Sequence, residues 1–210
     1  MQPEEQMFIA CVRHGRTDWN VQRRIQGRTD VPLNDAGRLD AQLTALRLAA
    51  ESWHAIYTSP LRRAAETARI IGLHLGLVPV SRPCLIERSY GTLEGTRARG
   101  RRREMRRRVQ ARGVESDGKL RRRAIACIEG LAGEHPGRRL IVVSHGAFIN
   151  ALLHVISGGK AGTGITRLAN GSICRIARDG QGRWTILSLN ETDHLVDPQG
   201  PSFRSGRPPV

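Results

Sequence analysis

The chain lacks the long hydrophobic runs that would place it in a membrane. None of its apolar stretches is long enough to span a bilayer, and the acidic first six residues lack a signal-peptide pattern. We therefore expect a cytoplasmic protein without membrane contact. A chain of 210 residues with 39% hydrophobic residues is long enough to bury one sizeable core, so we expect a single domain.

The chain holds only four cysteines, and their spacing disfavours two kinds of site. Cys11, Cys84, Cys127 and Cys174 lie far apart, without a CxxC pair or a cysteine–histidine cluster. Zinc sites and dithiol redox motifs use closer spacings than these. We expect four reduced, mostly buried thiols, as is usual in cytoplasmic proteins.

Acidic residues are scarce in one segment. Thirteen basic residues against three acidic ones lie between Arg97 and Arg123, which gives this segment +10 of the formal net charge of +15. We expect a strongly basic helix over residues 96–112 that ends at Gly113. Three interpretations of the Arg97–Arg123 surface stay open: a solvated lid, a funnel for anionic substrates, or a surface that binds nucleic acid or polyphosphate. The last lacks the interleaved aromatic residues of a base-stacking platform.

A short apolar run that ends in Arg13-His14-Gly15 is the most informative feature present. Residues 7–12 are few enough for a buried strand, and Gly15 ends the run at once. A second run, residues 140–144, ends in His145-Gly146. Ligands bind at the carboxyl ends of strands in open α/β sheets, so we expect both histidines in one site.

Further predicted helices and strands alternate along the chain, which implies a mostly parallel sheet covered on both faces. The first helix is capped by Asn34 or Asp35 and runs to about Ala50, with Leu39, Leu43, Leu46 and Ala50 on its apolar, buried face. A second helix opens at Ser59-Pro60 and buries Ala64, Ala68, Ile71 and Leu75. The remaining elements are strands at 54–58, 77–80, 173–176 and 184–189 and helices at 119–131 and 147–156.

The residues at the strand ends suit phosphoryl transfer. Arginine offers a planar fork of donors that matches phosphate oxygens, as Arg13 and Arg63 would. A neutral imidazole such as that of His14 can attack phosphorus and form a phosphohistidine. The arginines and His145 can neutralise the phosphate charge without a metal, and a carboxylic acid would protonate the leaving alkoxide.

Motifs over nearly the whole chain resemble those of the histidine phosphatase superfamily, in its phosphoglycerate mutase-like branch of small broad-specificity phosphatases. Arg13-His14-Gly15 with Thr17 and Asn20 is similar to the family signature. The further motifs follow in family order: Gln26-Gly27 with Asp30–Leu33 and Gly37, Thr58–Ala64 with Glu66–Ala68, Leu85–Arg88 with Tyr90-Gly91 and Glu94-Gly95, Gly113–Ser116, Val143–Gly146, and Asn190–Leu195.

The resemblance implies a three-layer αβα sandwich in one domain, residues 1–196. The basic segment would form a helical lid on it at about 96–123, and the Pro/Gly-rich composition of residues 197–210 predicts a poorly ordered tail. It implies His14 as nucleophile, Arg13 and Arg63 as phosphate clamps, and His145 as transition-state stabiliser. Glu87 would be the general acid and then the base, with Glu94 as the alternative. The implied phosphate or substrate contacts are Arg13, Thr17, Asn20, Gln26, Gly27, Arg63 and Gly146.

The resemblance implies a metal-independent phosphomonoester phosphatase that acts on small phosphorylated metabolites and releases inorganic phosphate. The stretch between Glu87 and His145 is short, which favours hydrolysis over mutase activity. One alternative is a phosphoglycerate mutase that uses 2,3-bisphosphoglycerate; otherwise we expect no cofactor. Another is a polyanion-binding module that uses the Arg97–Arg123 surface. A homodimer stays open. Arg16 stands where the family usually has Glu or Gln, which puts an extra positive charge near the pocket.

Overall fold

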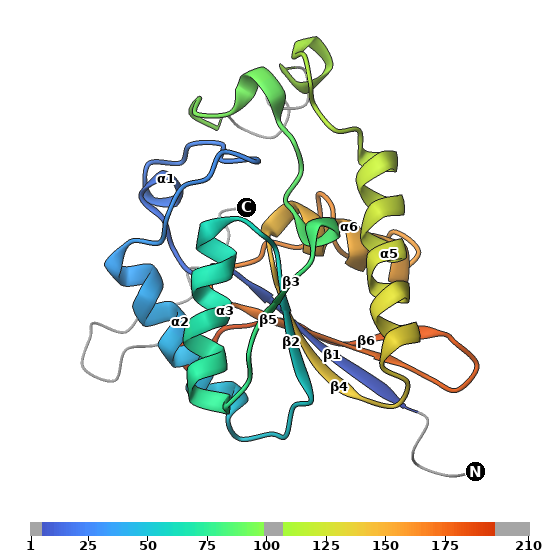
Figure 1. Ribbon diagram of the computed structural model, residues 1–210. Helices are drawn as coiled ribbons and strands as arrows, with labels where there is room; N and C mark the ends of the chain where they lie inside the picture. The colour runs from blue at the N-terminus through green and yellow to red at the C-terminus, as the bar shows by residue number, and fades with distance from the viewer. Residues whose placement is uncertain (1–5, 99–106, 196–210) are drawn as a thin grey trace.

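A six-stranded sheet forms the centre of the computed structural model, which describes residues 6–98 and 107–195 (Figure 1). The strand order is β3-β2-β4-β1-β5-β6. Strands β1 to β4 run parallel, while β5 and β6 are antiparallel to their neighbours. The predicted, mostly parallel sheet is confirmed. Its strands are β1 (Met7–Arg13), β2 (Ala55–Thr58), β3 (Val80–Ser81), β4 (Arg139–Ser144), β5 (Ile173–Arg178) and β6 (Trp184–Glu191).

Helices cover both faces of the sheet. Figure 1 shows α2 (Asp35–Leu48) and α3 (Arg62–Leu75) on one face and α5 (Asp117–Glu134) and α6 (Gly146–Ile156) on the other. This arrangement confirms the three-layer αβα sandwich. Shorter helical segments lie in the connections: α1 (Asp18–Val21), η2 (Pro83–Leu85), η3 (Gly91–Leu93) and η4 (Asp193–Leu195). No described helix is long and apolar enough to cross a membrane.

The core has two halves, one on each side of the sheet. Successive side chains of a strand point to opposite faces, so Ile9 packs with α5 and α6 while Val12 packs with α2 and α3. Strands buried on both faces are apolar throughout, as residues 7–12 and 140–143 are. This explains why these runs could be identified as strands from the sequence.

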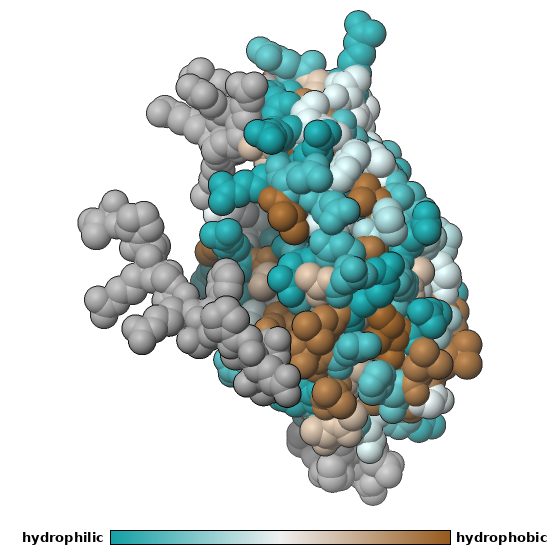
Figure 2. Space-filling view, turned by 90° about the vertical axis from the view of Figure 1, so that its left-hand side faces the viewer, coloured by the Kyte–Doolittle hydropathy of each residue, from teal (hydrophilic) through white to brown (hydrophobic). Residues whose placement is uncertain are grey.

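The predicted buried face of α2 is wrong. Leu39 and Leu46 are 40% and 61% exposed, and the helix buries Ala41, Ala45 and Leu48 instead. Two polar residues, Asp40 and Thr44, also belong to the buried face because they find hydrogen-bond partners there. Figure 2, viewed from the α2 side, shows apolar patches among the polar residues of this surface. On α3 the predicted face is confirmed: Ala64, Ala68 and Ile71 are buried and Leu75 packs against the same core.

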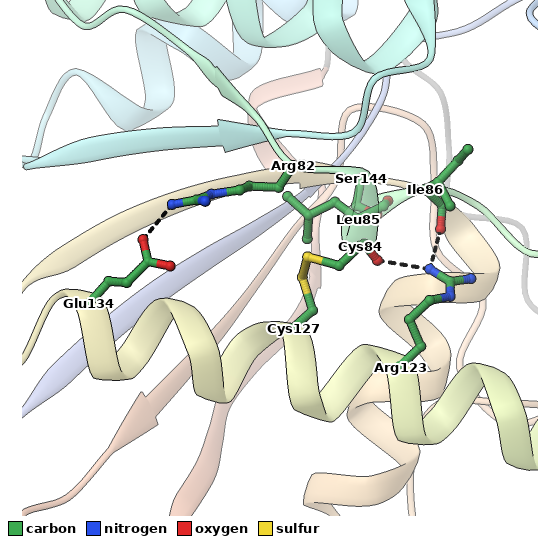
Figure 3. The surroundings of a disulfide bond; sticks show 8 residues. All are labelled: Arg82, Cys84, Leu85, Ile86, Arg123, Cys127, Glu134 and Ser144. Atoms are coloured by element: carbon green, nitrogen blue, oxygen red, sulfur yellow. Dashed lines mark hydrogen bonds and ion pairs between the residues drawn. A yellow bond between two sulfur atoms is a disulfide. The ribbon is translucent and has the colours of Figure 1, made fainter.

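The expectation of four reduced thiols is also wrong. Cys84 in η2 and Cys127 on α5 form a disulfide, with their Cα atoms 5.8 Å apart (Figure 3). Cys11 and Cys174 are free and buried, as expected. The bonded cysteines are 43 positions apart in the sequence. The spacing could not reveal this bond because the fold, and not the local sequence, brings them together.

The basic segment begins differently from the prediction. Arg97 forms an antiparallel bridge with Arg24, so the expected helix does not start at residue 96. Residues 107–110 are helical, and residues 99–106 lie outside the described part of the chain. The expected tail, residues 197–210, lies outside it as well. Two other boundaries shift: β3 begins at Val80, and Pro60 precedes α3 without belonging to its first turn.

Candidate active site

The strand order places three polar side chains side by side at the carboxyl edge of the sheet. The neighbouring strands β2, β4 and β1 are followed in the chain by Ser59, His145 and His14. The two histidine rings meet edge to face, with their centroids 5.1 Å apart. The structure therefore brings together the two histidines that lie 131 positions apart in the sequence.

His14 has the tautomer of a nucleophile. Its Nδ1 lies 2.7 Å from the carbonyl oxygen of Gly15. A carbonyl only accepts, so Nδ1 carries the proton and Nε2 presents a lone pair. Burial, followed by the charges of Arg63 and Arg13, holds the His14 pKa well below its usual range, which keeps the imidazole neutral.

Arg63 and Arg13 place two guanidinium groups near these rings. Arg63, 1% exposed, donates from Nη1 to the Thr29 carbonyl (2.8 Å) and from Nη2 to the Gly27 carbonyl (2.7 Å). Arg13 donates from Nη1 to the Leu168 carbonyl (2.6 Å). The Nε atoms of both arginines are buried without a hydrogen-bond partner. Within the described part of the chain, neither guanidinium group forms an ion pair with a carboxylate. Burial lowers the pKa of Arg63 to about 10, so the group stays cationic at neutral pH.

Glu94 fixes the loop that holds Arg63. Its Oε1 accepts hydrogen bonds from the amides of Arg28 and Tyr90, and its Oε2 accepts from the amide and the hydroxyl of Thr29. Burial raises the pKa of this carboxyl group, but the four hydrogen bonds outweigh it and lower the pKa overall. Gly27 has a φ of 53°, and a Cβ there would lie 2.2 Å from Glu94 Oε1. Glu94 is thus held within the loop by four hydrogen bonds.

Glu87 contacts the N-terminus of α6, the helix that begins directly after His145. Its Oε1 accepts from the amides of Arg88 (2.9 Å) and Phe148 (3.1 Å), and its Oε2 accepts from the amide of Ala147 (3.2 Å). Glu87 and Arg13 line the same cavity of about 410 Å³. The predicted acid is therefore placed beside the predicted phosphate clamp.

The other predicted contacts differ in what they are free to bind. Gln26 is buried with its Oε1 unpartnered. Thr17 caps α1, and its hydroxyl and amide both donate to Oδ1 of Asn20, so that oxygen is occupied within the protein. Gly146 lies beside Arg13: a Cβ at that position would be in ordinary van der Waals contact with Arg13 Nε, at 3.4 Å.

Three residues that were not among the predicted site residues support the site. Thr67 Oγ1 accepts from the amide of Gly15, and Asn170 Nδ2 donates to the carbonyl of His14. Ser59 Oγ lies 2.7 Å from Nε2 of His145. Ser59 and Thr67 belong to the family-like motifs Thr58–Ala64 and Glu66–Ala68, which could have indicated a role for them in the site. Nothing in the sequence marks Asn170.

Some of the charge expected around the pocket is compensated. Arg16 forms a two-point ion pair with the buried Asp40, with N–O distances of 2.8 and 2.7 Å. Within the basic segment, Arg123 pairs with Glu115 and donates to the carbonyl oxygens of Cys84 and Ile86 (Figure 3). Arg123 is therefore a structural residue and not part of an open basic surface.

A larger cavity, of about 890 Å³, adjoins the site. It shares four lining residues with the cavity at Glu87: Tyr90, Ala147, Asn150 and Gly164. Arg108 and Arg121 also line it. Among the described residues, no group of three His, Cys, Asp or Glu side chains could hold a metal ion. The cavity lining carries three arginines and two acidic residues, Glu115 and Asp117, and is suited to a polar molecule.

Comparisons with known proteins identify the family that this chain resembles. The family model of the histidine phosphatase superfamily (branch 1) matches residues 9–192. The uncharacterized phosphatase PhoE of Bacillus subtilis is 36% identical over 187 residues, which are 89% of this chain and 96% of the relative. The metal-independent phosphoserine phosphatase of Arabidopsis thaliana is 33% identical over 201 residues, which are 89% and 82% of the two chains.

A solved structure gives the same result for the fold. YhfR of Bacillus stearothermophilus aligns with a TM-score of 0.79 and 28% identity, covering 90% of this chain and 99% of that one. The resemblance inferred from the motifs is thereby confirmed over almost their whole range. The chain belongs to the histidine phosphatase superfamily, in its branch 1.

Proposed function

We propose that the protein is a phosphomonoester phosphatase that works through a phosphohistidine on His14. The observation that carries this proposal is a neutral His14 whose Nε2 presents a lone pair, placed near Arg13 and Arg63. Neither arginine forms an ion pair with a carboxylate of the described residues. A phosphate ester would satisfy both cations and offer the imidazole an electrophilic phosphorus.

The reaction has two displacement steps. Nε2 of His14 attacks phosphorus, the bond from phosphorus to the ester oxygen breaks, and the leaving alkoxide takes the proton of a protonated Glu87. Water then attacks the phosphohistidine and gives a proton back to Glu87. The N–P bond breaks, inorganic phosphate leaves, and His14 is neutral again.

Arg13 and Arg63 stabilise the phosphoryl oxygens through both steps. Phosphoryl transfer needs mainly positioning and charge neutralisation, and two fixed guanidinium groups supply these directly. We therefore propose that the reaction requires no metal. The name of the Arabidopsis relative, a metal-independent phosphoserine phosphatase, supports this part of the proposal.

The proposed substrates are small phosphorylated metabolites. The phosphate would lie at the arginines, with the buried Gln26 and Gly27 beside Arg63. The organic part would extend past Glu87 into the cavities lined by Tyr90, Asn150 and Arg108. The positive charge of this rim raises the local concentration of anionic esters.

A panel of phosphorylated metabolites, assayed for phosphate release in EDTA, tests the proposal. We expect release from several members, and no release from any would contradict it. Product analysis with 3-phosphoglycerate separates hydrolysis from isomerisation. Free phosphate supports the phosphatase, whereas 2-phosphoglycerate formed only with added 2,3-bisphosphoglycerate would assign the mutase reaction instead.

A further inference from the structure

The hydroxyl of Ser59 contacts one nitrogen of the second histidine. Ser59 is fully buried at the carboxyl end of β2, beside the end of β4. Its Oγ lies 2.7 Å from Nε2 of His145 and accepts a longer hydrogen bond, 3.3 Å, from the amide of Leu61. The other nitrogen, Nδ1 of His145, is buried without a partner among the described residues.

Only one direction of this hydrogen bond satisfies the hydroxyl. If Nε2 of His145 donated to Ser59, the hydroxyl hydrogen would be buried with no acceptor among the described residues, at a cost of about 1–3 kcal/mol. If Ser59 donates to Nε2, the hydroxyl uses both its hydrogen and its oxygen. The second arrangement leaves the imidazole proton on Nδ1.

The His145 ring is neutral, so its tautomer decides what it presents to a substrate. Burial, followed by the positive charge of the neighbouring Arg63 and the electrostatic effects of His14, Arg13 and Arg123, holds the His145 pKa well below its usual range. A neutral ring has one donor nitrogen and one acceptor nitrogen. A phosphoryl oxygen needs the donor, and a bare Nδ1 lone pair would repel it.

We propose that Ser59 is a positioning residue that fixes the tautomer of His145. By donating its hydroxyl hydrogen to Nε2, it keeps the proton on Nδ1, which then donates to an oxygen of the transferred phosphoryl group. Ser59 does not touch the substrate and acts only through the ring. The inference rests on the proposed phosphatase function for its catalytic consequence, but the tautomer itself does not depend on any substrate.

Nitrogen-15 NMR of the full chain, labelled at histidine, tests the tautomer directly. At neutral pH we expect His145 Nδ1 to be protonated and Nε2 to have the chemical shift of a hydrogen-bonded acceptor. The His145 signals are assigned by their loss in His145→Gln. A proton on Nε2 in the wild-type protein overturns the proposal, whether or not Ser59→Ala folds.

Kinetics of Ser59→Ala measure the consequence. Removal of one donor that acts in the transition state costs about 10²–10³-fold, so partial loss of the correct tautomer should lower kcat roughly 10- to 100-fold. KM should change little, the Nε2–H tautomer should appear in the spectrum, and Ser59→Thr should restore part of kcat. The matched control is Thr58→Val, which removes a neighbouring buried hydroxyl that donates to the Ser59 carbonyl.

The outcomes separate this inference from the proposed function. Unchanged kcat in a folded Ser59→Ala, or a lower kcat with Nδ1 still protonated, overturns the role of Ser59. Absence of phosphate release from the wild-type protein would contradict the phosphatase proposal, while the NMR spectrum would still report whether Ser59 sets the tautomer.

Discussion

Glu94 and Arg63 hold the same short loop through different backbone groups. Arg63 donates to the carbonyl oxygens of Gly27 and Thr29, while Glu94 accepts from the amides of Arg28 and Thr29. A carboxylate outside the pocket thus supports the backbone that positions a buried guanidinium. The phosphate clamp depends on both residues, although only one of them was predicted to bind phosphate.

Glu94→Gln tests this support. The amide NH₂ of glutamine cannot accept, so the variant loses hydrogen bonds on one side of the carboxyl group, and we expect a loss of about 1–2 kcal/mol in the free energy of unfolding. A loosened Arg63 should lower kcat/KM roughly 10-fold. Urea unfolding and phosphate release measure the two effects.

The matched control is Glu66→Gln, which removes the charge of a surface ion pair with Arg38. Its unfolding free energy should stay within about 0.5 kcal/mol of the wild-type value. If Glu94→Gln behaved like this control in both assays, the loop would not depend on Glu94.

His14→Ala should abolish turnover while the fold persists. Loss of a nucleophile removes the covalent step, so we expect kcat for p-nitrophenyl phosphate to fall at least about 10³-fold. The circular dichroism spectrum should match that of the wild type. Trapping with labelled phosphate ester and alkaline denaturation should leave label on the wild-type protein alone. Near-normal turnover in this variant would remove the mechanism.

Glu87→Gln should discriminate between leaving groups. An aryl oxide leaves without help, whereas an alkoxide needs a proton, so kcat/KM should fall about 10²-fold more for alkyl than for aryl phosphates. We choose kcat/KM because it reports only the steps up to the phosphohistidine. Equal losses for both ester classes would assign the acid role to another group.

Stability should rise with pH between about 5 and 7. Burial lowers the pKa values of His14 and His145 in the folded protein, while an unfolded histidine titrates near 6.5. Below that pH the unfolded chain binds more protons than the folded protein does. The contribution of these histidines to the free energy of unfolding is therefore complete above about pH 6.5 and declines as the pH falls. Each histidine contributes up to about 1.4 kcal/mol per pH unit. Urea unfolding at several pH values should show a free energy of unfolding that depends less steeply on pH in His145→Gln than in the wild type. An unchanged pH dependence would contradict a buried neutral ring.

Reduction of the disulfide should affect stability more than activity. A bond that closes a 43-residue separation between Cys84 and Cys127 stabilises by about 2–4 kcal/mol. The hydrogen bonds of Arg123 to the carbonyl oxygens of Cys84 and Ile86 persist without it, so the segment before Glu87 stays in place. Urea unfolding and kcat should be measured with and without reductant. The control is the double variant Cys84→Ala/Cys127→Ala, in which reductant should change neither quantity. A large fall in kcat on reduction would show that the disulfide itself positions Glu87.

The sequence predicted well those features that are local. The strand over residues 7–12 follows from a short apolar run, and its end at Gly15 needs no knowledge of distant residues. The helix that begins after Asn34 follows from a capping side chain. The motif order led to both histidines, both arginines and Glu87, which the structure places around one edge of the sheet. It did not reveal that Glu94 belongs to the loop, since four donors from three residues had to converge on it.

The sequence by itself determined, to within about one residue, where β1, β2 and β4 end and which polar residue follows each of them. It could do so because hydrophobic runs, glycines and caps act on their own neighbourhood. Only the tertiary structure decided which of these residues meet. Strand order put Ser59 beside His145, helix packing joined Cys84 to Cys127, and the buried Asp40 took up the charge of Arg16. Those pairings arise between segments far apart in the chain, where no local pattern specifies the partner.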